Sequence, residues 1–165
     1  LLAVLMIPSS FFILPQYQIV QSLGLLNSLP ALFLPNMFSI FGTFLLRQFF
    51  MALPNELEDA ARIDGCSRFM IFVKIMLPLV RSGLIALGIL TLRFAWNDLM
   101  WPMIVNTASE KMTLSAGLAL LQGQYVTEYP IMMSGAVMAV LPLLISFAIF
   151  QKQFIEGIAI QGIKG

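Results

Sequence analysis

Charged side chains gather in residues 54–78, whose sequence is PNELEDAARIDGCSRFMIFVKIMLP. The segment begins like a helix, because Asn55 suits the N-cap position and acidic residues crowd the first turn, where the helix dipole favours negative charge. Those acids are Glu56, Glu58 and Asp59. Glu58 and Arg62 are spaced i,i+4, which favours an ion pair. Carboxylates held in this way can bind a basic partner, so the predicted chemistry is electrostatic docking.

One face of the expected helix carries small side chains. The residues at its i, i+3, i+4 and i+7 positions are Leu57, Ala60, Ala61 and Asp64. Residues with this spacing share one side of a helix, and alanines allow another surface to approach the backbone. We therefore predict a docking loop, with a plain polar connector as the alternative.

A turn and a second helix should follow. Gly65 suits the C′ position, where a positive φ carries no Cβ penalty. Ser67 can cap a short helix from Arg68 to about Met76. Pro78 should end this helix, because proline cannot continue one without disruption.

The sequence offers no catalytic constellation. It has no histidine and a single cysteine, Cys66, which excludes Ser-His-Asp and Cys-His catalysis, HExxH metal sites and an internal disulfide. A near match to a phosphate-binding loop at Gly157–Gly162 is not followed directly by Lys and then Ser or Thr. We expect no enzyme activity, no metal site and no cofactor bound by this chain.

Composition places the chain in a lipid bilayer. It is 59% hydrophobic and 10% charged, with a mean hydropathy of +0.92, whereas soluble domains average about 25% charged residues. A soluble domain of 165 residues cannot bury so much apolar surface. The net charge of +1 gives no nucleic-acid footprint.

Four apolar segments are predicted to be membrane spans. They are residues 1–14, 29–50, 79–101 and 131–150. A spanning helix needs about 20 residues, so the first segment is interpreted as the tail of an incomplete span in a fragment of a longer protein. The predicted fold is all-α, a single polytopic membrane domain over residues 1–165.

The third predicted span contains polar residues, Arg93, Asn97 and Asp98. Ionisable groups at membrane depth are costly and usually face a bundle interior or water, which makes these residues candidates for lining a pathway. Trp96 and Trp101 favour an alternative for Asp98, an aromatic belt at the membrane interface.

Small residues indicate close helix contacts, at Ser82 with Ala86 and at Gly135 with Ala139. Pro142 should bend the last span. The connector 106–129 should contain a short amphipathic helix at Met112–Gln122.

Basic residues predict the orientation. If residues 54–78 are cytoplasmic, the inner connectors hold Arg47, Arg62, Arg68, Lys74, Arg81, Lys152 and Lys164. The outer connectors hold only Lys111. This asymmetry obeys the positive-inside rule and places both the loop and the C-terminal end in the cytoplasm.

The loop resembles the EAA loop of ABC-importer permeases, in which an EAA triplet is followed at fixed spacing by Gly and by I-x-L-P. The matching residues are Asp59-Ala60-Ala61, Gly65 and Ile75-Met76-Leu77-Pro78, with Asp59 in place of the usual Glu. Ile63-Asp64-Gly65 and Trp96-Asn97-Asp98, followed by Pro102, resemble the sugar-importer version. So do Met6-Ile7-Pro8 with Pro15, and the Gly-rich end from Gly157 to Gly165.

The resemblance implies a type I, binding-protein-dependent permease subunit of a bacterial or archaeal cytoplasmic membrane. It implies these partners: a second permease subunit, a cytoplasmic ATPase dimer that binds ATP and Mg²⁺, and an extracytoplasmic solute-binding protein. The loop would dock the ATPase through Glu56, Glu58, Asp59, Ala60, Ala61, Asp64, Gly65, Ile75, Leu77 and Pro78. The substrate would be a sugar or oligosaccharide, with a glycerol phosphate as the alternative.

Two other function classes compete with this interpretation. A secondary carrier or channel predicts coupling carboxylates within spans or matching broken helices in two halves, and only Asp98 is a candidate. An intramembrane hydrolase would need catalytic residues, and neither a histidine nor a recognisable aspartate pair is present.

Overall fold

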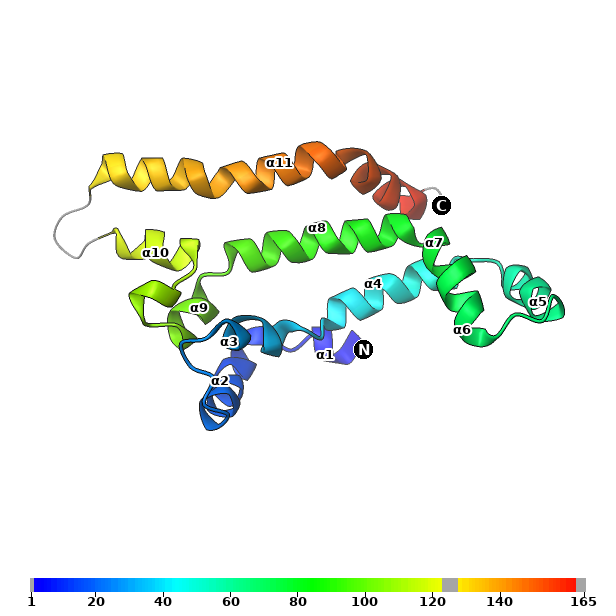
Figure 1. The fold of residues 1–165 in the computed structure, drawn as a ribbon, viewed down its shortest axis with the longest axis horizontal. Helices are drawn as coiled ribbons and strands as arrows, with labels where there is room; N and C mark the ends of the chain where they lie inside the picture. Colours follow the sequence, from blue (N-terminus) through cyan, green and yellow to red (C-terminus); the bar gives the residue numbers. More distant parts are fainter. Residues whose placement is uncertain (1, 123–127, 163–165) are drawn as a thin grey trace. The chain divides into compact units, whose positions relative to one another are not determined.

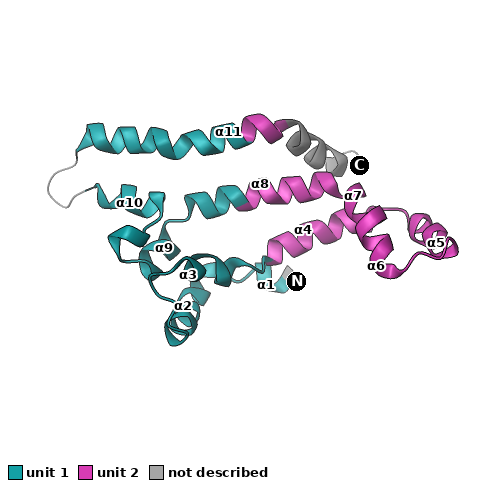
Figure 2. Ribbon diagram, viewed as in Figure 1, with its two compact units in different colours: residues 1–39, 92–146 teal, residues 40–91, 147–165 magenta. Residues whose placement is uncertain are grey.

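The computed structural model describes residues 2–122 and 128–162, and within them the chain consists of helices and turns without a β-strand (Figure 1). This confirms the predicted all-α class. The helices form two compact units, each described by itself. One comprises Leu1–Ser39 and Leu92–Ser146, and the other comprises Ile40–Thr91 and Phe147–Gly165 (Figure 2).

The first unit is made mostly of short helices. Before the chain enters the second unit they are α1 (Leu2–Leu5), a 3₁₀ turn (Ser9–Phe12), α2 (Ile13–Ser22), α3 (Leu29–Phe33) and a second 3₁₀ turn (Leu34–Asn36). After the chain returns they are the end of α8 (Arg81–Asn97), α9 (Met100–Val105), a 3₁₀ turn (Ser109–Lys111), α10 (Leu114–Leu120) and most of α11 (Tyr129–Gly162).

The core of this unit joins α2, α3 and α9. Its buried members are Val20, Ala31, Trp101 and Val105. The indole Nε1 of Trp101 donates a hydrogen bond to the carbonyl oxygen of Ala31 at 2.9 Å. Ala31 lies near the C-terminal end of α3, where carbonyls lack helical partners, so Trp101 both fills the core and caps α3.

An asparagine fixes the loop after α2 to the loop after α9. Asn27 has a positive φ of 55°, a conformation that asparagine tolerates better than most residues. Its Oδ1 accepts hydrogen bonds from the amides of Thr107 and Ala108, at 2.8 and 2.9 Å. The backbone amide of Asn27 donates to the carbonyl oxygen of Val105 at 2.9 Å. The two loops are therefore held together by one backbone–backbone bond and by two bonds from backbone amides to the Asn27 side chain.

Helix α11 touches α10 at one of its small residues. A Cβ added at Gly135 would meet a terminal methyl group of Leu118, so a larger residue there would require the Leu118 side chain to move. At Ala139, one turn further along α11, the carbonyl oxygen accepts a hydrogen bond from the indole of Trp96 at 2.9 Å. The prediction that Gly135 and Ala139 share a contact face is confirmed.

The second unit contains the loop that the sequence singled out. The elements of this unit are α4 (Ile40–Met51), α5 (Asn55–Ile63), α6 (Arg68–Ile71), a π-helical turn (Phe72–Met76), α7 (Leu77–Leu79), the greater part of α8 and the end of α11. Gly83 and Ala86 of α8 are buried, and a Cβ at Gly83 would lie 2.6 Å from the ring of Phe49 in α4. Of the predicted pair, Ala86 is buried and Ser82 is half-buried, and the tightest contact of this face is at Gly83.

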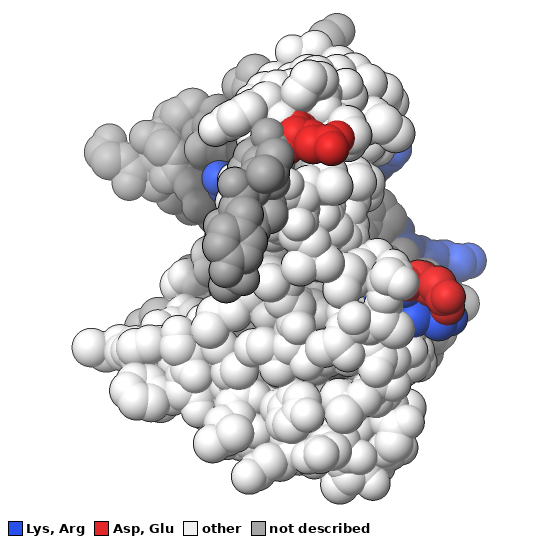
Figure 3. Space-filling model, turned by 90° about the vertical axis from the view of Figure 1, so that its left-hand side faces the viewer, with Lys and Arg blue, Asp and Glu red and all other residues white. Residues whose placement is uncertain are grey.

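One helical stretch is long and apolar enough to cross a membrane, namely Tyr129–Gln151 within α11. The number rises to three in the described chain if Leu29–Asn36 with Ile40–Met51, and Arg68–Leu79 with Arg81–Asn97, each count as one broken span. Uncharged side chains predominate on the face shown in Figure 3, where charges occur in small groups. Exposed apolar residues on α11, among them Val137, Met138 and Leu144, are suited to lipid contact.

Several predicted helix limits were wrong. Residues 1–14 do not form one helix, because the chain breaks after α1. Helix α2 then continues through Ser22, into the residues between the first two predicted spans. The helix predicted over 29–50 is interrupted between Asn36 and Ile40, and that over 79–101 is interrupted between Asn97 and Met100. Proline and long-range packing, seen at Trp101, override the local apolar pattern.

Two other predicted elements were close to the structure. The short helix expected at Met112–Gln122 is α10, capped by the hydroxyl of Thr113, which accepts a bond from the amide of Ala116. The span predicted at 131–150 lies within the longer α11, which contains Pro142. Parts of the predicted connector 106–129 and of the Gly-rich end lie outside the described residues.

Candidate docking site

Helix α5 begins one residue earlier than the sequence predicted. Pro54 occupies the N-cap position with φ −64° and ψ 135°, and no side chain caps the helix. Asn55 is therefore the first helical residue, and the prediction that it is the N-cap was wrong. The restricted φ of proline fixes the entry into the helix, and Glu56 and Glu58 still lie in the first turn.

The end of α5 forms the turn that Gly65 predicted. Gly65 has φ +78°. Its amide donates to the carbonyl oxygen of Arg62, and the amide of Cys66 donates to that of Ala61, both at 3.0 Å. These are the two bonds of a Schellman motif. A Cβ on Gly65 would meet no atom within 4 Å, so the requirement for glycine is conformational and not steric.

The second helix begins as predicted but does not end as predicted. The hydroxyl of Ser67 accepts a hydrogen bond from the amide of Met70 at 3.3 Å, which confirms it as the N-cap of α6. The chain then stays helical past Pro78 as far as Leu79, through a π-turn in which the amide of Leu77 donates to the carbonyl oxygen of Phe72. The extra residue in this turn accommodates the proline, and the break falls at Val80.

The charged residues of the loop are mostly in contact with solvent. Glu58 and Arg62 form the predicted ion pair, at 2.5 Å. Glu56, Asp59 and Asp64 are exposed. The first turn of α5 therefore presents the exposed carboxylate of Glu56 beside the positive end of the helix dipole, whereas Asp59 and Asp64 lie further along the helix and at its C-cap. All three carboxylates can accept hydrogen bonds from a basic partner.

The small-residue face of α5 is divided. Leu57 and Ala60 are exposed, whereas Ala61 is only 5% exposed and is covered by the chain itself. α5 packs against α6, which accounts for a buried alanine on this side of the helix. Of the remaining predicted residues, Ile75 and Leu77 are half-buried and Pro78 is exposed. The surface available to a partner is therefore formed by Leu57, Ala60 and the neighbouring acids.

The polar residues predicted to line a pathway lie at the end of α8. Arg93 and Asn97 are exposed and share a face, and Asn97 Nδ2 donates to the carbonyl oxygen of Arg93 at 2.9 Å. Asp98 instead has a local structural role. Its Oδ1 accepts a hydrogen bond from the amide of Trp101 at 3.4 Å, and its carbonyl oxygen accepts one from Ser115 at 2.7 Å.

The alternative of an aromatic belt does not fit the positions of the tryptophans. Trp101 is buried in the core of the first unit, and Trp96 is half-buried with its indole bonded to α11. Residues of an interfacial belt would present their rings to the lipid headgroups. Both tryptophans instead connect the end of α8 and α9 to other helices.

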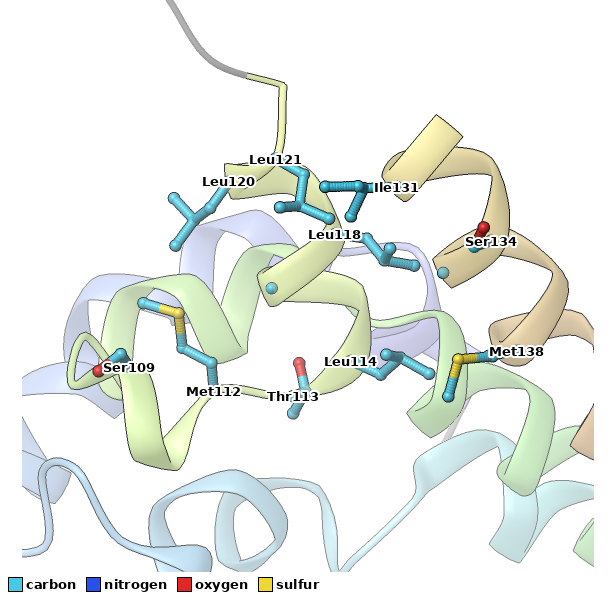
Figure 4. A pocket seen from close by; sticks show the side chains of 12 residues that line it. Ser109, Met112, Thr113, Leu114, Leu118, Leu120, Leu121, Ile131, Ser134 and Met138 are labelled. Atoms are coloured by element: carbon cyan, nitrogen blue, oxygen red, sulfur yellow. The ribbon is translucent and has the colours of Figure 1, made fainter. Parts of the chain in front are cut away.

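A groove of about 580 Å³ lies between α10 and α11 (Figure 4). Its lining is largely apolar, with Met112, Leu118, Leu121, Ile131 and Met138 around the hydroxyls of Ser109, Thr113 and Ser134. No charged side chain lines it. Specific small-molecule sites combine apolar walls with convergent polar groups, and this groove offers only isolated hydroxyls.

Sequence reasoning missed two aromatic contacts beside the loop. The ring of Phe49 covers Gly83, and the ring of Phe50 stacks on Phe72 with centroids 5.8 Å apart. The only sequence signal for these contacts is the pair of adjacent phenylalanines at the end of α4. An apolar pair near a predicted span is common, and its contact residues are known only from the structure.

Within the described residues the chain is all-α, with one clear apolar span, two possible broken spans and a charged helix–turn–helix between apolar segments. This combination is typical of a membrane protein. Residues 1–159 match the family described as the binding-protein-dependent transport system inner membrane component. The chain belongs to this family.

Curated relatives match nearly the whole chain. It is 42% identical to the arabinooligosaccharides transport system permease protein AraQ of Halalkalibacterium halodurans, over 99% of this chain and 59% of the relative. It is 36% identical to the sn-glycerol-3-phosphate transport system permease protein UgpE of Shigella flexneri, over 93% of this chain and 56% of the relative. It is 35% identical to the lactose transport system permease protein LacG of Rhizobium radiobacter, over 95% of this chain and 58% of the relative. The chain therefore spans somewhat more than half the length of these relatives.

Proposed function

We propose that this chain is part of a permease subunit in an ATP-driven importer, where it forms part of the transmembrane path. The importer would take up a sugar or oligosaccharide that an extracytoplasmic binding protein delivers, and a second permease subunit would complete the path. The relatives named for arabinooligosaccharides and lactose support a carbohydrate. The relative named for sn-glycerol 3-phosphate keeps a glycerol phosphate as the second candidate substrate.

The observation that carries the proposal is the docking loop, residues 54–78. It is a compact helix–turn–helix in which Leu57, Asp59 and Ala60 are exposed, with Leu57 and Ala60 on one face of α5. A separate cytoplasmic ATPase, which would bind ATP and Mg²⁺, would seat α5 in a groove. A basic residue of that groove would pair with the exposed carboxylate of Asp59, which lies in the middle of α5 and not in its first turn as the sequence predicted. The order of basic residues along the chain supports a cytoplasmic loop.

Arg93 and Asn97 are proposed to face the transport path, because they are exposed on one side of α8 and ionisable groups in spans avoid lipid. Asp98 is a weaker candidate, since its carboxylate and carbonyl already accept bonds from α9 and from Ser115.

The test compares loop variants in the full-length permease, co-expressed with its ATPase and binding protein. Ala60→Trp and Asp59→Lys should reduce co-purification of the ATPase by at least tenfold, because the first fills the contact surface and the second reverses its charge. Asp59→Glu should retain docking, since it keeps the charge.

Glycine supplies a matched pair of variants. Gly65→Ala and Gly24→Ala both place an alanine at positive φ, at +78° and +66°, in positions with no atom within 4 Å of the new Cβ. Each should cost about 1–2 kcal/mol of backbone strain, but only Gly65→Ala should weaken ATPase binding. Wild-type docking in Ala60→Trp and Asp59→Lys would show that the loop is a plain connector, and transport without any ATPase would favour a secondary carrier.

A further inference from the structure

The backbone between the docking loop and α8 is bent at a weak point. Arg68–Leu79 and Arg81–Asn97 meet at an angle of 72°. Three irregular features coincide there: the π-turn Phe72–Met76, Pro78 without an amide hydrogen, and Val80 with φ −92° and ψ 14°. Helices kink and hinge where the hydrogen-bond ladder is interrupted in these ways.

The end of α4 contacts both arms of this bend. Phe49 is 8% exposed, and three of its ring atoms lie 2.6–2.9 Å from the position of a Cβ on Gly83, just after the break. Phe50 stacks on Phe72, before the break, with ring centroids 5.8 Å apart and planes inclined by 26°. Successive residues on a helix point about 100° apart, so one rigid helix end reaches both arms.

We propose that Phe49 and Phe50 act as a clamp that stiffens the bent joint, so that force applied to the docking loop moves α4 and α8 together. Without the clamp, the joint at Val80 would flex, and displacement of α5 and α6 would be lost before it reached the apolar helices. The two phenylalanines are positioning residues, since they act through the helices and touch neither nucleotide nor substrate.

This inference rests on the proposed function but predicts a different phenotype. Loss of the docking surface should abolish ATPase binding, whereas loss of the clamp should leave binding intact and uncouple it from transport. The difference arises because Phe50 lies in α4, outside the docking loop, and because Phe72, although within residues 54–78, is not one of the residues predicted to contact the ATPase.

The experiment uses the full-length permease in its assembled complex, reconstituted in liposomes with the ATPase and binding protein. Phe50→Ala and Phe72→Ala should each lower the stimulation of ATP hydrolysis by loaded binding protein about 2- to 10-fold, the factor that corresponds to losing one aromatic pair. Co-purification of the ATPase should be unchanged. The double variant should be no worse than the more severe single variant, because both remove the same contact.

Two control variants test the mechanism. Phe72→Tyr keeps the ring, and the exposure of Phe72 lets the new hydroxyl reach solvent, so stimulation should stay at the wild-type level. Phe41→Ala removes an exposed ring from the same helix and should also leave stimulation unchanged.

Three results would overturn the clamp. Wild-type stimulation in both single variants would show that the ring pair transmits nothing. Additive losses in the double variant, or loss of ATPase co-purification by Phe72→Ala, would show that the rings act separately or contact the ATPase directly. If the unaltered permease bound no ATPase, the proposed function would fail and the clamp with it.

Discussion

Gly83 and Gly88 allow a sharp test of the packing between α4 and α8. Both lie within α8, and an alanine at either position improves helix propensity by about 0.5–1 kcal/mol. The two sites differ in their surroundings, since a Cβ at Gly83 meets the buried ring of Phe49 at 2.6 Å and a Cβ at Gly88 meets nothing within 4 Å.

The difference between the two variants should therefore isolate the cost of overpacking. The helix-propensity gain is common to both and cancels. Forcing a methyl group against an immobile ring costs about 1–3 kcal/mol, so Gly83→Ala should be less stable than Gly88→Ala by that amount. Gly88→Ala itself should be as stable as the wild type or slightly more stable.

The assay is the free energy of unfolding from SDS titration in mixed micelles. A smaller side chain opposite the new methyl group should relieve the overpacking. The double variant Gly83→Ala with Phe49→Leu should therefore regain part of the stability that Gly83→Ala loses. Equal stabilities for Gly83→Ala and Gly88→Ala would refute the reasoning, because they would show that the ring of Phe49 does not press on Gly83.

Three further predictions follow from other contacts. Trp101→Phe should lower the free energy of unfolding in the same titration by about 1–3 kcal/mol, because the buried carbonyl of Ala31 loses its donor; an unchanged stability would refute this cap. Arg93→Leu should leave membrane insertion intact and impair uptake of substrate into cells, and normal uptake would mean that Arg93 does not face the path. In a Cys66→Ala background, a cysteine at Ser109 should react with a membrane-impermeant thiol reagent added to intact cells, whereas one at Asn55 should not; labelling at position 55 would reverse the orientation.

Local features of the loop could be predicted because their partners are close in sequence. Gly65 closes bonds to residues within the same turn of helix, Ser67 caps an amide three residues away, and Glu58 pairs with Arg62 one turn away. The N-cap of α5 was mispredicted because Asn55 suits the N-cap position by residue type, whereas the structure places Pro54 there and Asn55 at the first helical position. Only the backbone angles distinguish these two positions.

The breaks in the helices were only partly predictable, because local prolines and distant residues both contribute to them. The apolar run from residue 79 to 101 reads as one span until Trp101 is seen to bond to Ala31, which is 70 positions away. Likewise, the helical pattern places Ala61 beside Leu57 but does not reveal that the chain itself covers Ala61. Periodicity identifies a face, whereas its partner depends on the tertiary fold.

The π-turn also sets the rotational register of the loop. A π-turn holds one residue more than the α-helical turn it replaces. Deleting one residue within Phe72–Met76 would restore a regular helix and rotate everything before it by about 100°. The exposed side of α5 would then face a new direction, although the residues that form this surface would be unchanged. Chimaeras that exchange loops between permeases should therefore be joined outside this turn, or must match its length.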